Sequence, residues 1–223
     1  MNISKVGIER LINSMSETLI NNLSEILSTP NASFALLGVF ILICFSIYVK
    51  KIKFTTRMLV YISLMLAFTI ILQQLRIYHL PQGGGVTLGS MVPLLLLSYR
   101  YGVRIGVLAG FLYGLIDILQ DPFILHPIQV LFDYPLPYMS LGLAALIPAH
   151  KFLSTLLAFI CRFAFHFISG VVFFSSYAPE GTSAIMYSLT VNLSYMLPEC
   201  IICFVILKIL PLDRLLTFMD RKS

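Results

Sequence analysis

Apolar positions in this chain gather in seven runs, separated by short polar or basic stretches. A helix that crosses a bilayer needs about 20 predominantly apolar residues. Runs of this kind predict membrane-spanning helices, because helices on the surface of a water-soluble domain carry an apolar stripe and not a continuous apolar run. The predicted helices cover residues 33–49, 58–75, 86–99, 103–119, 127–148, 152–174 and 184–210.

The third run is short, and a glycine-rich stretch leads into it. Gly83, Gly84 and Gly85 follow one another there, and glycine permits turns and irregular backbone. Irregular backbone at membrane depth is tolerated only where protein covers it. We therefore expect a loop that packs on the protein, and not on lipid, before this helix.

The composition excludes a water-soluble domain. The 223 residues are 58% hydrophobic and 11% charged, whereas soluble proteins carry about 25% charged residues. A chain this apolar is not disordered either. Seven helices use most of the length, which leaves no room for a separate catalytic or nucleotide-binding domain. The sequence predicts an all-α membrane protein.

The net charge of +5 is explained by membrane topology and not by nucleic-acid binding. If the loop at residues 50–57 faces the cytoplasm, eleven Lys and Arg residues lie on that side of the membrane and three on the other. Cytoplasmic loops of membrane proteins carry such an excess. We expect the N-terminus outside, the C-terminus in the cytoplasm, and no nucleic-acid partner.

Ionisable residues inside the predicted helices indicate a binding site. At mid-membrane each costs about 2.5–3.5 kcal/mol on insertion scales, so such residues usually face a cavity or a partner. Counted from the outer helix ends, polar residues of several helices reach comparable depth beneath the outward-facing loops. We therefore expect a pocket that opens outward. The ionisable residues are Asp117, Asp133, Arg162, His166 and Glu199.

Acidic groups outnumber basic ones in this predicted pocket, and aromatic residues surround them. Gln129 and Asp133 share one helix face, with Tyr134 beside them. Carboxylates and ring faces both attract cations, so the pocket suits a flat, cationic ligand that forms hydrogen bonds. For Arg162 a purely structural ion pair with Asp133 or Glu199 is the alternative.

Four glycines at every fourth position of the helix at residues 103–119 predict a packing seam and not a site. Small residues at this spacing allow another helix backbone to approach closely. The four are Gly102, Gly106, Gly110 and Gly114.

Two other classes of protein are weaker alternatives. An intramembrane enzyme would use Asp133, His166 and Glu199 as acid–base groups or metal ligands, but the sequence contains no HExxH pairing. A self-sufficient secondary carrier is disfavoured because no inverted repeat is evident. The sequence also lacks the GxxxxGK[ST] motif that ATP hydrolysis would require. We expect no covalent chemistry, no cofactor and no metal.

Several short motifs follow one another between residues 58 and 211. They are PQGG at 81–84, MVP at 91–93, SYRYG at 98–102, HPIQ at 126–129, DY at 133–134, HFISG at 166–170, YAPEG at 177–181 and YSLTVN at 187–192. Together, in this order, they resemble the thiamine-specific substrate-binding subunits (ThiT, or YuaJ) of energy-coupling-factor transporters.

This resemblance implies a six-helix core that binds thiamine from outside. The helix predicted at residues 33–49 is one additional N-terminal transmembrane helix, which has no counterpart in that core. The loop at residues 76–89, with Gly83, Gly84 and Gly85, is implied to be a lid. Family members commonly carry Trp in the walls of the site, whereas this chain has no Trp. The residues implied to bind thiamine are Asp133, Tyr134, His166, Tyr187 and Asn192, with Tyr113, Phe123 and Phe174 as aromatic walls; Gln129 and Asp117 join them by their predicted positions.

The resemblance also implies partners in a bacterial cell membrane, namely a transmembrane coupling subunit and two ATPase subunits. Ser63 and Ala67 offer a small-residue face for docking to the coupling subunit, and a lipid-facing role for them is an equal alternative. Residues 1–56 would hold an amphipathic segment and the extra helix, 57–215 the binding domain and 216–223 a cytoplasmic tail. A secondary carrier, or a subunit for another small cationic vitamin, is the alternative function.

Overall fold

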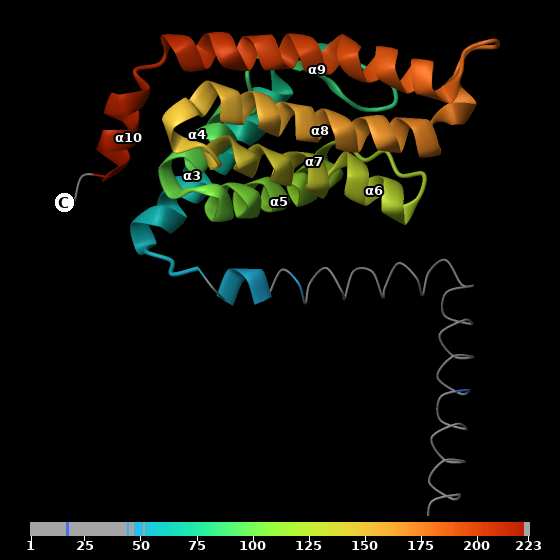
Figure 1. The fold of residues 1–223 in the computed structure, drawn as a ribbon. Coiled ribbons are helices and arrows are strands. Elements are labelled where there is room, and N and C mark those ends of the chain that lie inside the picture. Colours follow the sequence, from blue (N-terminus) through green and yellow to red (C-terminus); the bar gives the residue numbers. More distant parts are fainter. Residues whose placement is uncertain (1–16, 18–43, 45–46, 51, 221–223) are drawn as a thin grey trace, which may run out of the picture. The chain divides into compact units, whose positions relative to one another are not determined.

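The computed structural model describes residues 17, 44, 47–50 and 52–220 of the chain. The chain divides into two compact units, residues 1–53 and residues 54–223. In the first unit, residues 47–50 are helical. The prediction of an extra helix at residues 33–49 therefore lies almost wholly outside the described residues. The helices, the strands and the cavity described below all belong to the second unit (Figure 1).

Four long helices form the frame of the second unit. They are α3 (Thr56–Gln74), α5 (Val103–Gln120), α8 (Lys151–Phe173) and α9 (Ala184–Ile209). Within the described part of the chain, these four helices are long and apolar enough to cross a membrane. Helices α8 and α9 lie side by side (Figure 1). The prediction of an all-α membrane protein is thereby confirmed for this unit.

The third predicted helix is shorter than its apolar run, because a hairpin occupies the start of that run. Strand β1 (Arg76–His79) pairs antiparallel with β2 (Gly85–Thr87), and the turn between them contains Gly83 and Gly84, both with positive φ. Helix α4 begins only at Val92 and ends at Tyr101. The expected irregular approach to this helix is thus a two-stranded hairpin, which the sequence pattern did not predict.

The fifth apolar run, predicted as one helix with its hydrogen-bond ladder broken at Pro135 and Pro137, forms four separate pieces, so its prediction as a single helix is corrected. The pieces are α6 (Pro127–Asp133), α7 (Pro135–Ser140) and the 3₁₀ turns η1 (Leu141–Ala145) and η2 (Pro148–His150). Tyr134 stands at the first break with φ −116° and ψ −80°. Pro135 follows it, and proline lacks the N–H and disfavours helical backbone in the preceding residue.

Helix α5 packs directly on the backbone of this broken segment. A Cβ added at Gly110 would lie 2.1 Å from the carbonyl oxygen of Tyr138, and one added at Gly114 would lie 2.7 Å from the Cα of Pro135. Gly106 faces Gly142 in the same way, at 2.7 Å. The predicted packing seam is confirmed at these three glycines, where no side chain larger than hydrogen fits, whereas a Cβ added at Gly102 would meet nothing within 4 Å.

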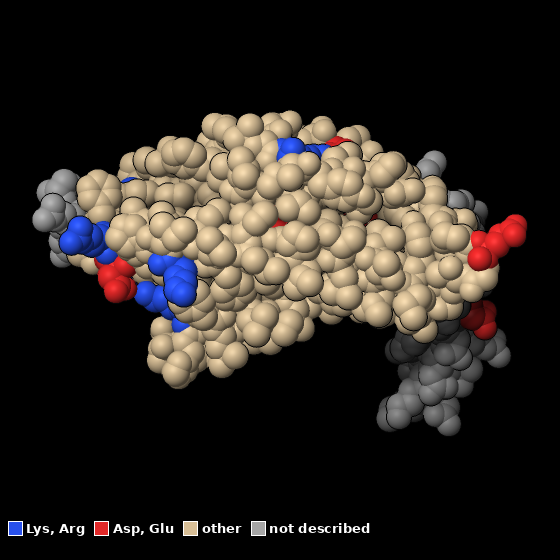
Figure 2. All heavy atoms as spheres, turned by 90° about the horizontal axis from the view of Figure 1, so that it is seen from above, with Lys and Arg blue, Asp and Glu red and all other residues tan. Residues whose placement is uncertain are grey.

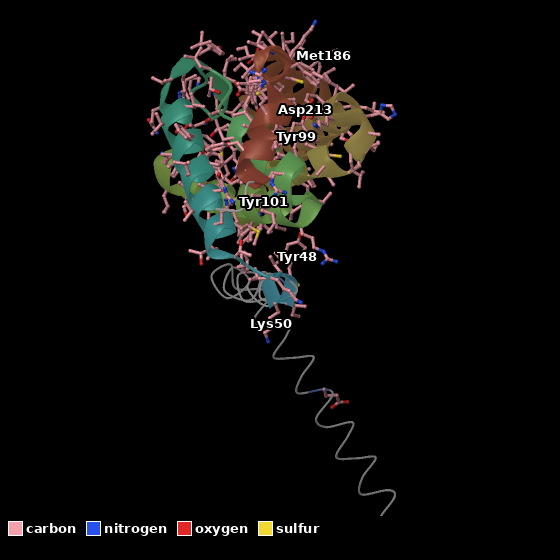
Figure 3. The ribbon with its side chains drawn as sticks, turned by 90° about the vertical axis from the view of Figure 1, so that its left-hand side faces the viewer. Tyr48, Lys50, Tyr99, Tyr101, Met186 and Asp213 are labelled. Atoms are coloured by element: carbon pink, nitrogen blue, oxygen red, sulfur yellow. The ribbon has the colours of Figure 1, made fainter. Side chains whose placement is uncertain are left out.

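Basic side chains gather at one end of the unit. Figure 2 shows Lys and Arg beside an acidic patch at the end that carries α10 (Leu212–Asp220), a further basic patch midway along the unit, and acidic side chains at the opposite end. Figure 3 views this end, with Tyr99 and Asp213 labelled. Helix α10 was not predicted. In its first turn, Oδ1 of Asp213 lies 3.3 Å from Nζ of Lys151. The boundary expected between residues 215 and 216 falls inside this helix.

Candidate functional site

A cavity in the second unit is lined by α5, α6, α8, α9, the hairpin and the break between α6 and α7. Twelve of the residues that the sequence analysis selected line it. They are Asp117, Phe123, Gln129, Asp133, Tyr134, His166, Phe174, Tyr187 and Asn192, with the hairpin glycines Gly83, Gly84 and Gly85. The structure thus brings together residues that lie up to 109 positions apart, from Gly83 to Asn192.

Asp133 lies at the C-terminal end of α6 and contacts two neighbours. Its Oδ2 accepts a hydrogen bond of 2.6 Å from Nε2 of Gln129, and its Oδ1 lies 3.4 Å from Nδ1 of His166 on α8. Nε2 of His166 is buried and has no hydrogen-bond partner among the described residues. The carboxylate is therefore oriented by protein, while one imidazole nitrogen remains available to a ligand.

The polar atoms of Gln129 and Tyr134 form hydrogen bonds with the loop over the cavity. These two side chains therefore fix the loop and offer few free polar groups. Nε2 of Gln129 also donates to the carbonyl of Phe123 at 3.0 Å, and its Oε1 accepts from the N–H of Leu125 at 3.0 Å. The hydroxyl of Tyr134 accepts from the N–H of Phe123 at 2.7 Å and donates to the carbonyl of Asp121 at 2.8 Å. These bonds fix where Phe123 stands.

Asn192 belongs to a hydrogen-bonded stripe on α9. Its Nδ2 donates to the carbonyl of Ser188 at 2.9 Å and to the carbonyl of His166 at 3.3 Å. Its Oδ1 accepts from the hydroxyl of Tyr195 at 2.8 Å. The side chain therefore joins α9 to α8 at the height of the cavity.

Aromatic rings cover part of the cavity, but one of the predicted walls does not. The rings of Phe123 and Phe174 stack with centroids 5.6 Å apart, and Tyr177 meets Phe123 edge-on at 6.2 Å. Tyr113, which was predicted as a wall, is fully buried behind Tyr138 and does not line the cavity. Tyr138 takes the place on the cavity wall that was assigned to Tyr113.

The hairpin is attached to the helices at two places. Near its start, Nη1 of Arg76 and Nε2 of His79 both contact Oδ2 of Asp121, at 2.6 and 2.8 Å. At its end, the N–H and hydroxyl of Thr87 donate to the carboxylate of Glu199 on α9, at 2.6 and 2.7 Å. Between these anchors the turn passes over the cavity.

Several residues at the cavity were not among those selected from the sequence. Arg76, Asp121 and Tyr138 all line it. Arg162 and Glu199, which the sequence analysis named as ionisable residues inside predicted helices, line it as well. Pairing Arg76 with Asp121 across 45 positions depends on the path of two loops, which the sequence pattern does not supply.

The structural ion pair considered for Arg162 is not formed. No ion pair joins Arg162 to Asp133 or Glu199 in the described chain, and Nε and Nη1 of Arg162 have no hydrogen-bond partner there. The guanidinium carbon instead lies 4.9 Å from the ring centroid of Tyr138.

The charge around the cavity is mainly negative. Asp117, Asp121, Asp133 and Glu199 line it, against Arg76 and Arg162. Partial burial raises the pKa of Asp121, but hydrogen bonds from His79 and Arg76 and their charges outweigh burial, so its pKa lies below the ordinary 3.8. Among the described residues no group of three or more His, Cys, Asp or Glu could hold a metal ion. The cavity thus favours a cation that can stack on aromatic rings.

Apolar helices around an acidic and aromatic cavity define a membrane protein that binds a small ligand. Residues 59–219 match the family described as thiamine transporter protein (Thia_YuaJ). The chain therefore belongs to this thiamine transporter family; it is a multi-pass membrane transport protein and not an enzyme.

Individual relatives agree with this assignment. The chain is 35% identical to the thiamine transporter ThiT of Bacillus subtilis (strain 168) over 175 residues, or 68% of this chain and 88% of that protein. It is 28% identical to ThiT of Lacticaseibacillus paracasei over 141 residues, or 54% and 70%. A solved structure of ThiT from Listeria monocytogenes superposes with a TM-score of 0.62 at 21% identity, covering 73% of this chain and 96% of that chain.

Proposed function

We propose that this chain is the high-affinity thiamine-binding subunit of an ATP-driven energy-coupling-factor transporter. It would bind thiamine from outside and deliver it together with an energising module. The observation that carries the proposal is the convergence of Asp133, His166 and Asn192, from three separate helices, on one cavity in a chain of the thiamine transporter family.

Thiamine matches the chemistry of this cavity. Its thiazolium ring is a flat cation, and its aminopyrimidine ring carries an amino donor beside ring nitrogens that accept hydrogen bonds. In this proposal Asp133 accepts from the amino group, and His166, whose Nδ1 lies beside Asp133, offers its free Nε2 to the ligand. Phe123 and Phe174 supply ring faces, which attract cations.

The hairpin would act as the lid of the site. Its residues Gly83, Gly84 and Gly85 lie over the cavity, and its two ends form polar contacts with Asp121 and Glu199. Entry of a ligand would require the hairpin to lift, and exclusion of water after closure would strengthen each electrostatic contact inside.

The energising partners are a coupling subunit and two ATPase subunits. Ser63 and Ala67 are exposed one turn apart on α3, as a docking face for another helix requires. The basic end with α10 would face the cytoplasm, which puts the C-terminus inside and the N-terminus outside.

Uptake measurements in lipid vesicles test this function directly. Vesicles that contain this chain, the coupling subunit and the ATPases should accumulate labelled thiamine only with ATP on the ATPase side. Vesicles with this chain alone should bind thiamine without accumulating it. Accumulation by this chain alone would favour a secondary carrier. If another cationic vitamin competed more strongly than unlabelled thiamine, that vitamin would be the ligand in place of thiamine.

A further inference from the structure

The hairpin meets the helices along two edges that differ in burial. Along β2, Thr87 and its partner Glu199 on α9 are each 2% exposed. Along β1, the contact is open to water, since the side chains of Arg76 and His79 are 18% and 40% exposed and that of Asp121 is 30% exposed. One edge is therefore sealed and the other is solvated.

The β2 edge is fixed by a hydrogen-bond network that ends on the carboxylate of Glu199. Its Oε2 accepts from the N–H of Thr87 at 2.6 Å, and its Oε1 accepts from the hydroxyl of Thr87 at 2.7 Å. The hydroxyl oxygen of Thr87 accepts in turn from the N–H of Ser90 at 2.9 Å. The hydroxyl of Ser90 donates to Oε1 of Gln73 at 2.9 Å. The network thus joins β2 to α9 and to the last turn of α3.

Apolar packing holds the same edge. Val86 of β2 is buried in one cluster with Tyr195 and Met196 of α9. Two residues after β2, a Cβ added at Gly89 would lie 2.4 Å from Cδ1 of Ile206, also on α9, and the φ of Gly89 is +81°. Moving β2 away from α9 would therefore separate packed side chains as well as the network.

The contacts of the two edges differ in the cost of breaking them. A buried carboxylate that loses its hydrogen bonds is left without water to replace them, which is costly. A partly exposed ion pair exchanges its partner for water and contributes little. The contacts of Asp121 should therefore separate while those of Glu199 persist.

We propose that the hairpin opens along the β1 edge and turns about the β2 edge, and that Glu199 is the positioning residue that holds this hinge. Thiamine then enters between β1 and the loop that carries Asp121 and Phe123. Glu199 acts on binding through Thr87 and β2 and not by touching the ligand. This inference rests on the proposed function, because the ligand that the hairpin admits is thiamine.

Distances between spin labels in the purified full chain test this inference. The first pair, Tyr78→Cys with Leu119→Cys, spans the β1 edge, and the second, Leu88→Cys with Leu193→Cys, spans the β2 edge; all four positions are exposed. The background has its four native cysteines replaced by Ala. Without thiamine we expect a broad distance distribution for the first pair and a narrow one for the second. Saturating thiamine should narrow the first and leave the second unchanged.

Two variants of the hinge and one of the opposite edge complete the test. Glu199→Gln and Thr87→Val keep the size of the side chain and remove one hydrogen bond of the network. Each should broaden the second pair and weaken thiamine binding about 10-fold. Asp121→Asn is the matched control, which should broaden the first pair and leave the second narrow. If Glu199→Gln does not fold, as thermal unfolding shows, Thr87→Val decides.

Three results would overturn the inference. They are a second pair that changes with thiamine as much as the first, a first pair that thiamine leaves unchanged, and a second pair that stays narrow in the folded hinge variants. A wild-type protein that binds no thiamine would contradict the proposed function instead.

Discussion

The carboxylate of Asp133 is shared between Gln129 and His166. Oδ2 accepts from Gln129 at 2.6 Å, and Oδ1 lies 3.4 Å from Nδ1 of His166. One contact comes from the same short helix, α6, and the other from α8, so the acid is positioned by two elements. Because α6 ends at Asp133 itself, the break at Tyr134 decides where this carboxylate stands.

Replacing Gly84 with Ala should weaken thiamine binding by hindering lid closure. A Cβ at Gly84 would lie 3.0 Å from the ring of Tyr195, and its φ of +81° strains any other residue. Gly181 is a matched control, since it has the same φ but open space around a Cβ. We expect the affinity of Gly84→Ala to fall about fivefold or more below that of Gly181→Ala. Equal affinities of the two variants in a titration would argue against a closing hairpin.

Asp121→Asn should release the start of the hairpin. Arg76 and His79 both contact Oδ2 of Asp121, and such partly exposed pairs contribute modestly, so thiamine should dissociate about two- to fivefold faster. Stopped-flow displacement measures this rate.

The same variant gives a pH test with a defined sign. The pKa of Asp121 lies below its ordinary 3.8, so the carboxylate stabilises the closed hairpin above that pH and this stabilisation is lost as pH falls through the lower, folded value. The slower dissociation of the wild type relative to Asp121→Asn should persist from pH 7 down to about 4 and vanish below it. A difference that vanishes well above pH 4 would argue against the Asp121 carboxylate as the anchor of the hairpin.

Enlarging the small-residue face of α3 should stop transport and spare binding. Ser63→Leu combined with Ala67→Leu fills the exposed face proposed for docking. Val60→Leu is the control, because Val60 is 59% exposed on the same helix. Thiamine titration should give wild-type affinity in both proteins, whereas ATP-driven uptake should fail only in the double variant. Normal uptake in the double variant would indicate that Ser63 and Ala67 face lipid and not the coupling subunit.

Gly110→Ala should destabilise the fold. The added Cβ would lie 2.1 Å from the carbonyl oxygen of Tyr138, so α5 and α7 must move apart, at about 1–3 kcal/mol or more. Thermal unfolding in detergent should show a lower midpoint than for Leu119→Ala, whose side chain is 84% exposed. An unchanged midpoint would mean that this seam can separate without cost.

The sequence pattern was sufficient for the frame of the second unit. Continuous apolar runs predicted α3, α5, α8 and α9, and the glycine spacing predicted the seam of α5, because both depend on local periodicity. The hairpin was not predicted, and Pro135 and Pro137 indicated a break in the helical hydrogen bonds but not the separate helices α6 and α7. Both depend on the backbone conformation that Pro and Gly residues adopt once the neighbouring helices have packed.

For the site, the polar residues within apolar runs were informative because burying them in lipid is costly. This argument selected Asp133, His166 and Asn192. It could not show that Tyr113 lies behind Tyr138, since both side chains are apolar in bulk and only their packing order separates them. Nor could it reveal the anchors of the hairpin, which join distant loops.

Thiamine titration of Asp133→Asn tests the central claim most directly. Asn keeps the shape of the side chain and can still accept from Gln129, but it lacks the charge that a thiamine cation and its amino group would meet. Asp213→Asn is the control, because the side chain of Asp213 is 97% exposed in α10. The account predicts that Asp133→Asn binds thiamine about 10- to 100-fold more weakly, with wild-type affinity in Asp213→Asn. Wild-type affinity in Asp133→Asn would contradict it.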